Sequence, residues 1–159
     1  MAVVVSTLRN SGALQNDYLL QLAEWHHNEW LHLNPGGTLE QRLARYNKSV
    51  QASGLPEIFI ACENKKLLGS VTLAKEDMDT RKFLTPWLAS LFVVPEQRNK
   101  GIASQLITFI INYAKENGFK NLYLFTEDQT NFYRHRGWYF VETVNYRQTD
   151  VDLMCRKLD

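Results

Sequence analysis

The order of the expected secondary-structure elements predicts an α/β protein, with a mixed sheet of about seven strands flanked by about four helices. Two observations support this class. Short runs rich in β-branched and aromatic residues indicate strands, and segments with apolar residues at helical spacing indicate helices. The length of 159 residues suits a single domain over residues 1–159, and 45% hydrophobic with 22% charged residues is a globular balance.

The N-terminal half is expected to hold one strand, two helices and a hairpin. The β-branched run AVVVSTL predicts the strand, and helical spacing from about Asn16 predicts a first helix that NPGG ends. Thr38 and Gln41 have the spacing of a capping box, so a second helix is expected from Thr38 to about Ser53. The segments EIFIACE and KLLGSVTLAK, separated by NKK, predict a β-hairpin.

The C-terminal half is expected to alternate strands and helices. WLASLFVV predicts a fourth strand, and a helix follows that opens near Lys100 and Gly101 and ends where Gly118 can adopt a left-handed cap. A strand at NLYLF, a short helix around QTNFYRHR and terminal strands near WYFVETV and VDLMCRKL complete the chain. Helices on both faces of the sheet are therefore expected.

Composition excludes several classes of function. The formal net charge is +1 with scattered lysines and arginines, which argues against a nucleic-acid partner. No apolar stretch approaches the roughly 20 residues of a membrane-spanning helix. The start MAVVVSTLRN lacks a basic leader with a long apolar region, so a cytoplasmic location without a membrane partner is expected. Cys62 and Cys155 have no C-x-x-C spacing and are expected to be buried, reduced thiols.

The segment VVPEQRNKGIAS joins a strand directly to a helix and predicts an anion site. The first amides of a helix have no intrahelical acceptor and carry partial positive charge. Gly101 allows close backbone approach, and Arg98, Lys100 and Ser104 can add charge or a donor, which suits a diphosphate. On spacing alone, the same segment also fits a solvated turn capped by a glycine. Neither G-x-x-x-x-G-K-[ST] nor G-x-G-x-x-G occurs, which argues against nucleotide hydrolysis or dinucleotide binding.

The string LFVVPEQRNKGIASQLI resembles the acetyl-CoA signature of the GCN5-related N-acetyltransferase (GNAT) family. That signature is an apolar strand, a proline and then [RQ]-x-x-G-x-[GA], which here runs from Arg98 to Ala103. The resemblance implies a GNAT-like fold and acetyl-CoA as cofactor. It also implies a splayed fourth strand whose free backbone groups pair with the pantetheine arm, while amides from Asn99 to Ser104 hold the pyrophosphate.

A second string, TNFYRHRGW, resembles the later GNAT segment in which an Asn-Phe-Tyr sequence sits on a short helix. By this match Asn131 contacts the cofactor and Tyr133 lies beside its sulfur. A phenol can protonate a departing thiolate, so Tyr133 is the expected catalytic acid. The cofactor-binding residues implied by the two strings are Leu91, Phe92, Val93, Arg98, Asn99, Lys100, Gly101, Ile102, Ala103, Ser104 and Asn131.

The proton acceptor is left open by the sequence. Many relatives carry a glutamate near the position of Ala89 or Ser90, and this chain has no carboxylate there. Glu127 and Asp128 remain candidates, as do residues of the first helix, although a hydrogen-bonded packing role is favoured for His26. The first-helix candidates are Trp25, His26, His27, Glu29, Trp30 and His32. No H-E-x-x-H spacing occurs, so no metal site is expected.

The resemblance implies an N-acetyltransferase that moves an acetyl group directly to a primary amine of a small molecule or peptide N-terminus, in a ternary complex. The segment HLNPGGT and the tryptophans Trp25, Trp30 and Trp87 are candidates for walls of the acceptor site. The missing fourth-strand carboxylate keeps an alternative open, a catalytically silent acyl-CoA-binding sensor or partner module. The acceptor's identity is left open, and so is a homodimer, because relatives often dimerise and no segment here specifies it.

Overall fold

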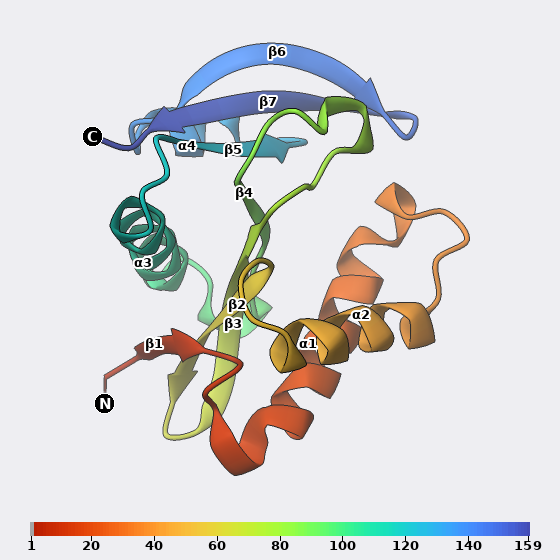
Figure 1. Cartoon of the computed structure of the whole chain (residues 1–159), viewed down its shortest axis with the longest axis vertical. Coiled ribbons are helices and arrows are strands. Elements are labelled where there is room, and N and C mark those ends of the chain that lie inside the picture. Colours follow the sequence, from red (N-terminus) through yellow and green to blue (C-terminus); the bar gives the residue numbers. More distant parts are fainter. Residues whose placement is uncertain (1) are drawn as a thin grey trace.

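A computed structural model describes residues 2–159 and confirms the predicted class. One seven-stranded sheet runs in the order β1-β2-β3-β4-β5-β7-β6, in which β4 and β5 are parallel and the other neighbours antiparallel (Figure 1). The strands are β1 (Val4–Thr7), β2 (Glu57–Glu63), β3 (Lys66–Ala74), β4 (Trp87–Val93), β5 (Asn121–Thr126), β6 (Tyr139–Tyr146) and β7 (Thr149–Lys157). The helices are α1 (Gln15–Trp30), α2 (Leu39–Gln51), α3 (Ile102–Glu116) and α4 (Thr130–Arg134).

The first half of the sheet is covered by helices on both faces. In Figure 1, α1 and α2 lie on one side of β2 and β3, and α3 lies on the other. Alternate residues of β2 serve the two sides, because successive side chains of a strand point to opposite faces. Phe59 and Ala61 pack in the cluster that includes α3, whereas Ile58 and Ile60 pack with buried residues of α1 and α2.

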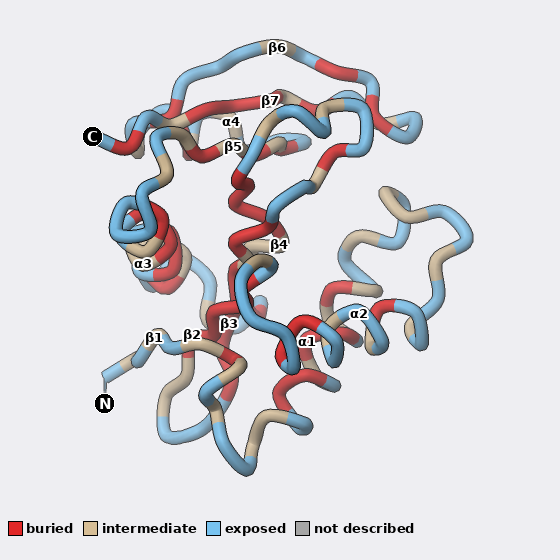
Figure 2. The backbone as a smooth tube through the Cα atoms, in the orientation of Figure 1, coloured by how far each residue is buried: buried red, intermediate tan, exposed pale blue. Residues whose placement is uncertain are grey.

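On the side of the sheet where α1 and α2 lie, strands β4, β5 and β7 pack against a loop and a hairpin. There the loop of residues 75–86 and the β6–β7 hairpin enclose a third cluster that includes Met78, Trp87, Tyr146 and Leu153. β6 arches over β7 and is largely exposed along its outer side (Figure 2). Within residues 2–159, the members of this cluster come from strands and from the loop of residues 75–86, and none comes from α1 to α4.

Most element ends agree with the sequence, and the deviations are small. Thr38 and Gln41 form both halves of the expected capping box, and Gly118 has the expected left-handed φ of 83°. The helix expected to open near Lys100 begins at Ile102, because Gly101 adopts a φ of 85° and serves as its N-cap. Both cysteines are free as expected, but Cys62 is only partly buried, whereas Cys155 is buried. No helix within residues 2–159 is long and apolar enough to cross a membrane.

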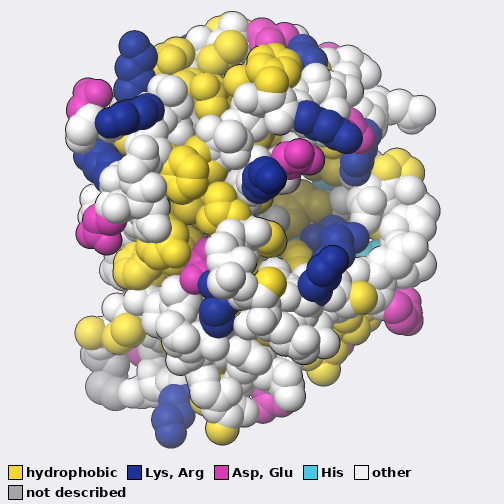
Figure 3. Space-filling model, viewed as in Figure 1, with side chains coloured by type: hydrophobic (Ala, Val, Ile, Leu, Met, Phe, Trp, Pro, Cys, Tyr) yellow, Lys and Arg dark blue, Asp and Glu magenta, His cyan; other side chains and the backbone are white. Residues whose placement is uncertain are grey.

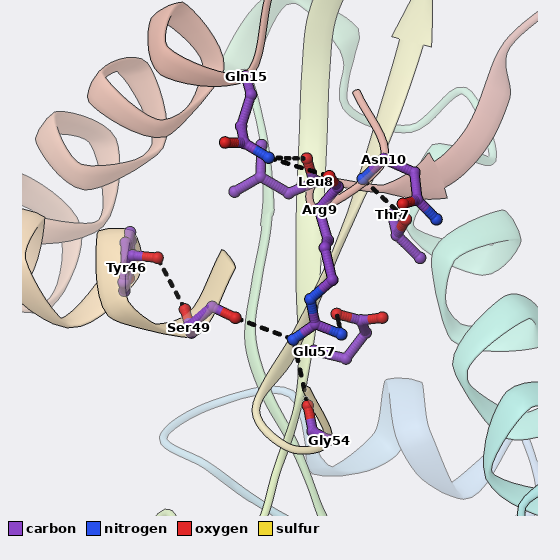
Figure 4. Close-up of polar contacts among 9 residues, drawn as sticks. All are labelled: Thr7, Leu8, Arg9, Asn10, Gln15, Tyr46, Ser49, Gly54 and Glu57. Atoms are coloured by element: carbon purple, nitrogen blue, oxygen red, sulfur yellow. Dashed lines mark hydrogen bonds and ion pairs between the residues drawn. The ribbon is translucent and has the colours of Figure 1, made fainter. Parts of the chain in front are cut away.

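Arg9 ties the end of β1 to α2 and β2 (Figure 4). Its Nη1 lies 2.8 Å from the carboxylate of the buried Glu57 at the start of β2. Its Nη2 donates to the carbonyl oxygens of Ser49 at 2.8 Å and of Gly54 at 3.3 Å. One guanidinium therefore closes the end of α2 against the sheet, and a buried carboxylate balances its charge.

The fourth strand separates from the fifth after one residue pair. Only Trp87 and Tyr123 are in register between β4 and β5. On its other side, β4 carries an extra residue opposite β3 around Ser90, whose φ is 53°, which is a β-bulge. The expected splayed fourth strand is thus confirmed. Gly69 of β3 permits it, since an added Cβ there would lie 2.6 Å from the Phe92 carbonyl oxygen.

Candidate functional site

A cavity of about 1220 Å³ follows the gap between β4 and β5. One end lies at the start of α3, and the other lies among α2, the loop of residues 75–86 and the β6–β7 turn. Figure 3 shows a hollow with hydrophobic side chains in its depth and Lys or Arg side chains beside its opening. A single space therefore connects the expected anion site with the far loops.

The start of α3 has the backbone shape of an anion cradle. Asn99 and Gly101 both adopt positive φ, 63° and 85°, which turns the chain sharply before the helix. The first intrahelical bond runs from the Gln105 N–H to the Gly101 carbonyl, so the amides just before Gln105 have no helical acceptor. These amides and the helix dipole favour a negatively charged group at this end of the cavity.

Most of the predicted site residues line this one cavity. They are Leu91, Phe92, Val93, Arg98, Asn99, Gly101, Ile102, Ala103, Ser104 and Tyr133. Lys100 and Asn131 lie outside the lining. Lys100 is exposed with its ammonium 3.5 Å from Gln97 Oε1, and Asn131 lies on the exposed side of α4. Its carbonyl accepts hydrogen bonds from the ring and backbone of His135.

Arg136 lies at the anion end and was missed by the sequence reasoning. Its Nη2 is 3.2 Å from the Ser104 hydroxyl, and its guanidinium lies 3.6 Å from the centre of the Phe132 ring. At the same end, Arg98 donates from Nε to the Val93 carbonyl at 2.8 Å. Arg136 belongs to the string TNFYRHRGW, but its approach to α3 depends on the tertiary fold. Two guanidinium groups therefore reinforce the cradle.

Tyr133 combines burial with a free hydroxyl. Its side chain is 7% exposed and packs edge-on against Trp138 at 5.8 Å between ring centres. Burial raises the pKa of Tyr133, and the nearby Arg136 only partly offsets this. Within residues 2–159, no hydrogen-bond partner of the Tyr133 hydroxyl is found. The phenol therefore stays protonated at neutral pH and can donate into the cavity.

Asp77 lies at the opposite end of the cavity and was also missed. It comes from the polar stretch EDMDTRKFLTP, in which no site residue is predicted from the sequence. Burial raises the pKa of Asp77 to about 7, and the charge of Arg147 opposes this shift. Arg147 donates to the Leu33 carbonyl at 2.8 Å and to Asp79 at 3.2 Å, which joins the α1–α2 loop, the loop of residues 75–86 and the β6–β7 turn. Asp77 can therefore exchange a proton near neutral pH.

His26 has the packing role that was favoured for it. The ring is fully buried, with Nδ1 2.7 Å from the Tyr46 hydroxyl and Nε2 2.9 Å from the Ser70 hydroxyl. Burial, together with a smaller effect of the Arg42 charge, lowers the pKa of His26 to about 3. A ring that is neutral at all ordinary pH values, with both nitrogens engaged, cannot take a proton from an amine.

The other residues expected to line the acceptor site or to accept a proton lie partly in the cavity lining and partly in the core. Glu127 and Asp128 line the cavity, and Glu127 lies 2.6 Å from Nε2 of His32. Trp30 lines the cavity, whereas Trp25 stacks on Phe92 and Trp87 is fully buried. Within residues 2–159, no group of three or more His, Cys, Asp or Glu is arranged to hold a metal ion.

Comparison with known proteins agrees with this geometry. The family model described as "Acetyltransferase (GNAT) family" matches residues 19–138. No curated protein sequence matches the chain. An acetyltransferase of the GNAT family from Staphylococcus aureus Mu50 superposes with a TM-score of 0.70 and 19% identity over 99% of this chain and 100% of that one.

Two further solved structures of similar fold contain coenzyme A. An aminoglycoside 6′-N-acetyltransferase complexed with coenzyme A superposes with a TM-score of 0.73 and 14% identity, over 98% of this chain and 97% of that one. An N-acetylglutamate synthase from Neisseria gonorrhoeae, complexed with coenzyme A and N-acetylglutamate, gives 0.67 and 15%, over 100% of this chain and 36% of that one. At these identities the likeness establishes the fold.

Proposed function

The chain belongs to the GNAT acetyltransferase family, whose cofactor is acetyl-CoA, and from this premise we propose that it transfers the acetyl group directly to a primary amine in a ternary complex. The observation that carries the proposal is the continuity of the cavity. The same space connects the amide cradle of α3, the free hydroxyl of Tyr133 and the titratable carboxylate of Asp77. A donor and an acceptor can therefore be bound together.

The cofactor is assigned to the part of the cavity between β4 and α3. The open edge of β4 at Leu91, Phe92 and Val93 offers backbone groups to the pantetheine arm, although the Val93 carbonyl already accepts from Arg98. The amides from Asn99 to Ser104 suit the pyrophosphate. Arg136 adds a cation there, and Lys100 and Asn131 are assigned to the rim. Acetyl-CoA supplies an activated acyl group and a sulfur leaving group.

Tyr133 is the proposed acid. The new C–N bond forms as the C–S bond breaks, and the Tyr133 hydroxyl gives its proton to the departing sulfur. A backbone N–H in the bulge of β4, at Leu91 or Val93, can polarise the thioester carbonyl. The proton that leaves the acylated nitrogen then restores the phenol through water. The raised pKa of Tyr133 ensures that the proton is present before the transfer.

Asp77 is the proposed proton acceptor. An alkylammonium has a pKa of about 10.4 and must lose a proton before it can attack. A base is most effective when its pKa lies near the working pH, and Asp77 has a pKa of about 7 at the acceptor end. Glu127 is less suited because His32 holds its carboxylate. Asp77 receives the ammonium proton, directly or through one water, and releases it to solvent.

The direct experiment measures release of free thiol from acetyl-CoA in the presence of a panel of primary amines and peptides. We expect release that depends on both acetyl-CoA and an amine, with acetylated amine formed in equal amount. Calorimetry measures coenzyme A binding in parallel. Binding without thiol release from any acceptor would instead support the silent sensor, which the lack of a carboxylate at Ala89 or Ser90 favours.

A further inference from the structure

Arg42 is a buried cation, and part of its guanidinium group has no hydrogen-bond partner in the described part of the chain. Its side chain lines the acceptor end of the cavity and the residue is 7% exposed. Nη1 donates to the Tyr46 hydroxyl at 3.0 Å. Nε is buried and has no hydrogen-bond partner within residues 2–159, and no bond from Nη2 is found there either. In a guanidinium, Nε–H and one N–H of Nη2 point along the same edge, so both donors of this edge lack a hydrogen-bond partner among the described residues.

Arg42 also lacks a counterion in the described chain. No carboxylate of residues 2–159 lies within 4.0 Å of it, whereas Arg9, Arg81 and Arg147 each have one. A buried charge without an opposite charge is costly, and so is a buried donor without an acceptor. An anion bound here would supply both the missing acceptor and the missing opposite charge.

The surrounding residues hold the guanidinium in this orientation. The Tyr46 hydroxyl accepts from Arg42 and can donate to Nδ1 of His26, whose Nε2 then donates to Ser70. His26 remains neutral because burial lowers its pKa to about 3. The chain of hydrogen bonds fixes the Nη1 side of Arg42, and the donors of the Nε/Nη2 side are not used in it.

We propose that the acceptor is a primary amine that also carries a carboxylate, and that the free Nε/Nη2 edge of Arg42 binds this carboxylate. The inference rests on the proposed function, because it specifies the second substrate of that reaction. A planar carboxylate matches two parallel N–H donors, a pairing that a hydroxyl or an uncharged amide cannot reproduce. Asp77, Glu29 and Glu76 line the same end and suit the ammonium group of such a zwitterion.

Two kinds of amine carry a carboxylate close enough to be bound in this way. One is a free amino acid, through its α-carboxylate. The other is a peptide whose first residue is acidic, through its side chain. Both present the same chemistry to Arg42, and matched pairs of acceptors distinguish them. The first pair is leucine and leucinamide, and the second is a C-terminally amidated peptide that begins with Asp or with Asn.

The experiment compares kcat/KM within each pair for the wild-type enzyme, Arg42→Gln and Lys48→Gln. Lys48 is an exposed cation of the same helix outside the cavity lining, so its variant controls for the loss of one charge. We expect the wild type and Lys48→Gln to prefer the carboxylate member of at least one pair by roughly 10- to 100-fold, the range of hydrogen bonds to charged groups. Arg42→Gln should lose this preference.

The wild-type comparison decides the matter even where Arg42→Gln folds poorly, which thermal unfolding of the variant reveals. Equal kcat/KM for both members of both pairs, with acetyl transfer to each, would overturn the inference and leave the proposed function standing. A preference that persists in folded Arg42→Gln would overturn the role of Arg42. Transfer to other amines of the panel but to no member of either pair would also overturn the inference, whereas coenzyme A binding without transfer to any amine of the panel would overturn the proposed function itself.

Discussion

Replacing Tyr133 by Phe removes one hydroxyl and tests the acid directly. The structure limits the side effects of this change. The ring remains packed against Trp138, and no partner within residues 2–159 loses a hydrogen bond when the hydroxyl is removed. The free energy of unfolding should therefore stay nearly the same, and any loss of activity reports chemistry.

The size of the effect follows from the role. General acid catalysis contributes about 10²- to 10⁴-fold, which corresponds to roughly 3–5 kcal/mol of transition-state stabilisation. We expect kcat of Tyr133→Phe to fall by about 100-fold or more, measured as the initial rate of thiol release. The dissociation constant of acetyl-CoA, measured by calorimetry, should hardly change, because the phenol acts on the departing sulfur and not on the bound ground state.

Tyr113→Phe is the matched control. Tyr113 lies on α3 outside the cavity lining and packs on Phe59 at 4.9 Å between ring centres, so its hydroxyl has no proposed role. Its variant should retain full activity. An unchanged kcat for Tyr133→Phe across the pH range would refute the acid assignment, and a large rise in the dissociation constant would show that the phenol serves binding.

Three further substitutions test other parts of the account. Wild-type kcat/KM should fall as the pH drops below about 7 because Asp77 gains a proton, and Asp77→Asn should abolish this limb of the profile; a limb that persists in the variant would exclude Asp77 as the base. The raised pKa also means that the stability of the wild type relative to Asp77→Asn falls as the pH rises toward 7, which urea unfolding at several pH values measures. Gly69→Ala should cost about 1–3 kcal/mol in thermal or urea unfolding, because the Cβ meets the Phe92 carbonyl, and an unchanged stability would show that the bulge relaxes freely. Glu57→Gln should cost about 1–3 kcal/mol at neutral pH, since it leaves the partly exposed Arg9 without its counterion, and equal unfolding midpoints would argue against that clamp.

Local chemistry explains why the elements were predictable. The capping box at Thr38 and the left-handed Gly118 are short-range patterns, and both occur as predicted. The splay of β4 was implied only by the family resemblance. The bulge was not predicted, because the residue with positive φ is Ser90, a type that gives no local signal for a left-handed conformation. The start of α3 was misplaced slightly because Gly101 caps the helix instead of entering it.

The site was predictable where it follows a continuous string and not where distant segments meet. The cradle of α3 and Tyr133 belong to two such strings. Arg136 belongs to the second string, but its approach to Ser104 depends on the tertiary fold. Arg42 and Asp77 reach the cavity from a helix face and a loop, and nothing in their neighbouring residues indicates a shared space. Their significance depends on burial and on missing partners, which are properties of the folded chain.

The single residue pair between β4 and β5 has a mechanical consequence. Strands β1 to β4 form one hydrogen-bonded part of the sheet, and strands β5 to β7 form the other. The pairing between the two parts stops after Trp87 and Tyr123. A molecule bound in the gap between β4 and β5 that contacts both strands takes the place of the missing contacts between them. Binding of substrate between β4 and β5 should therefore make the sheet more rigid. In the unliganded enzyme, the sheet should be most flexible between these two strands.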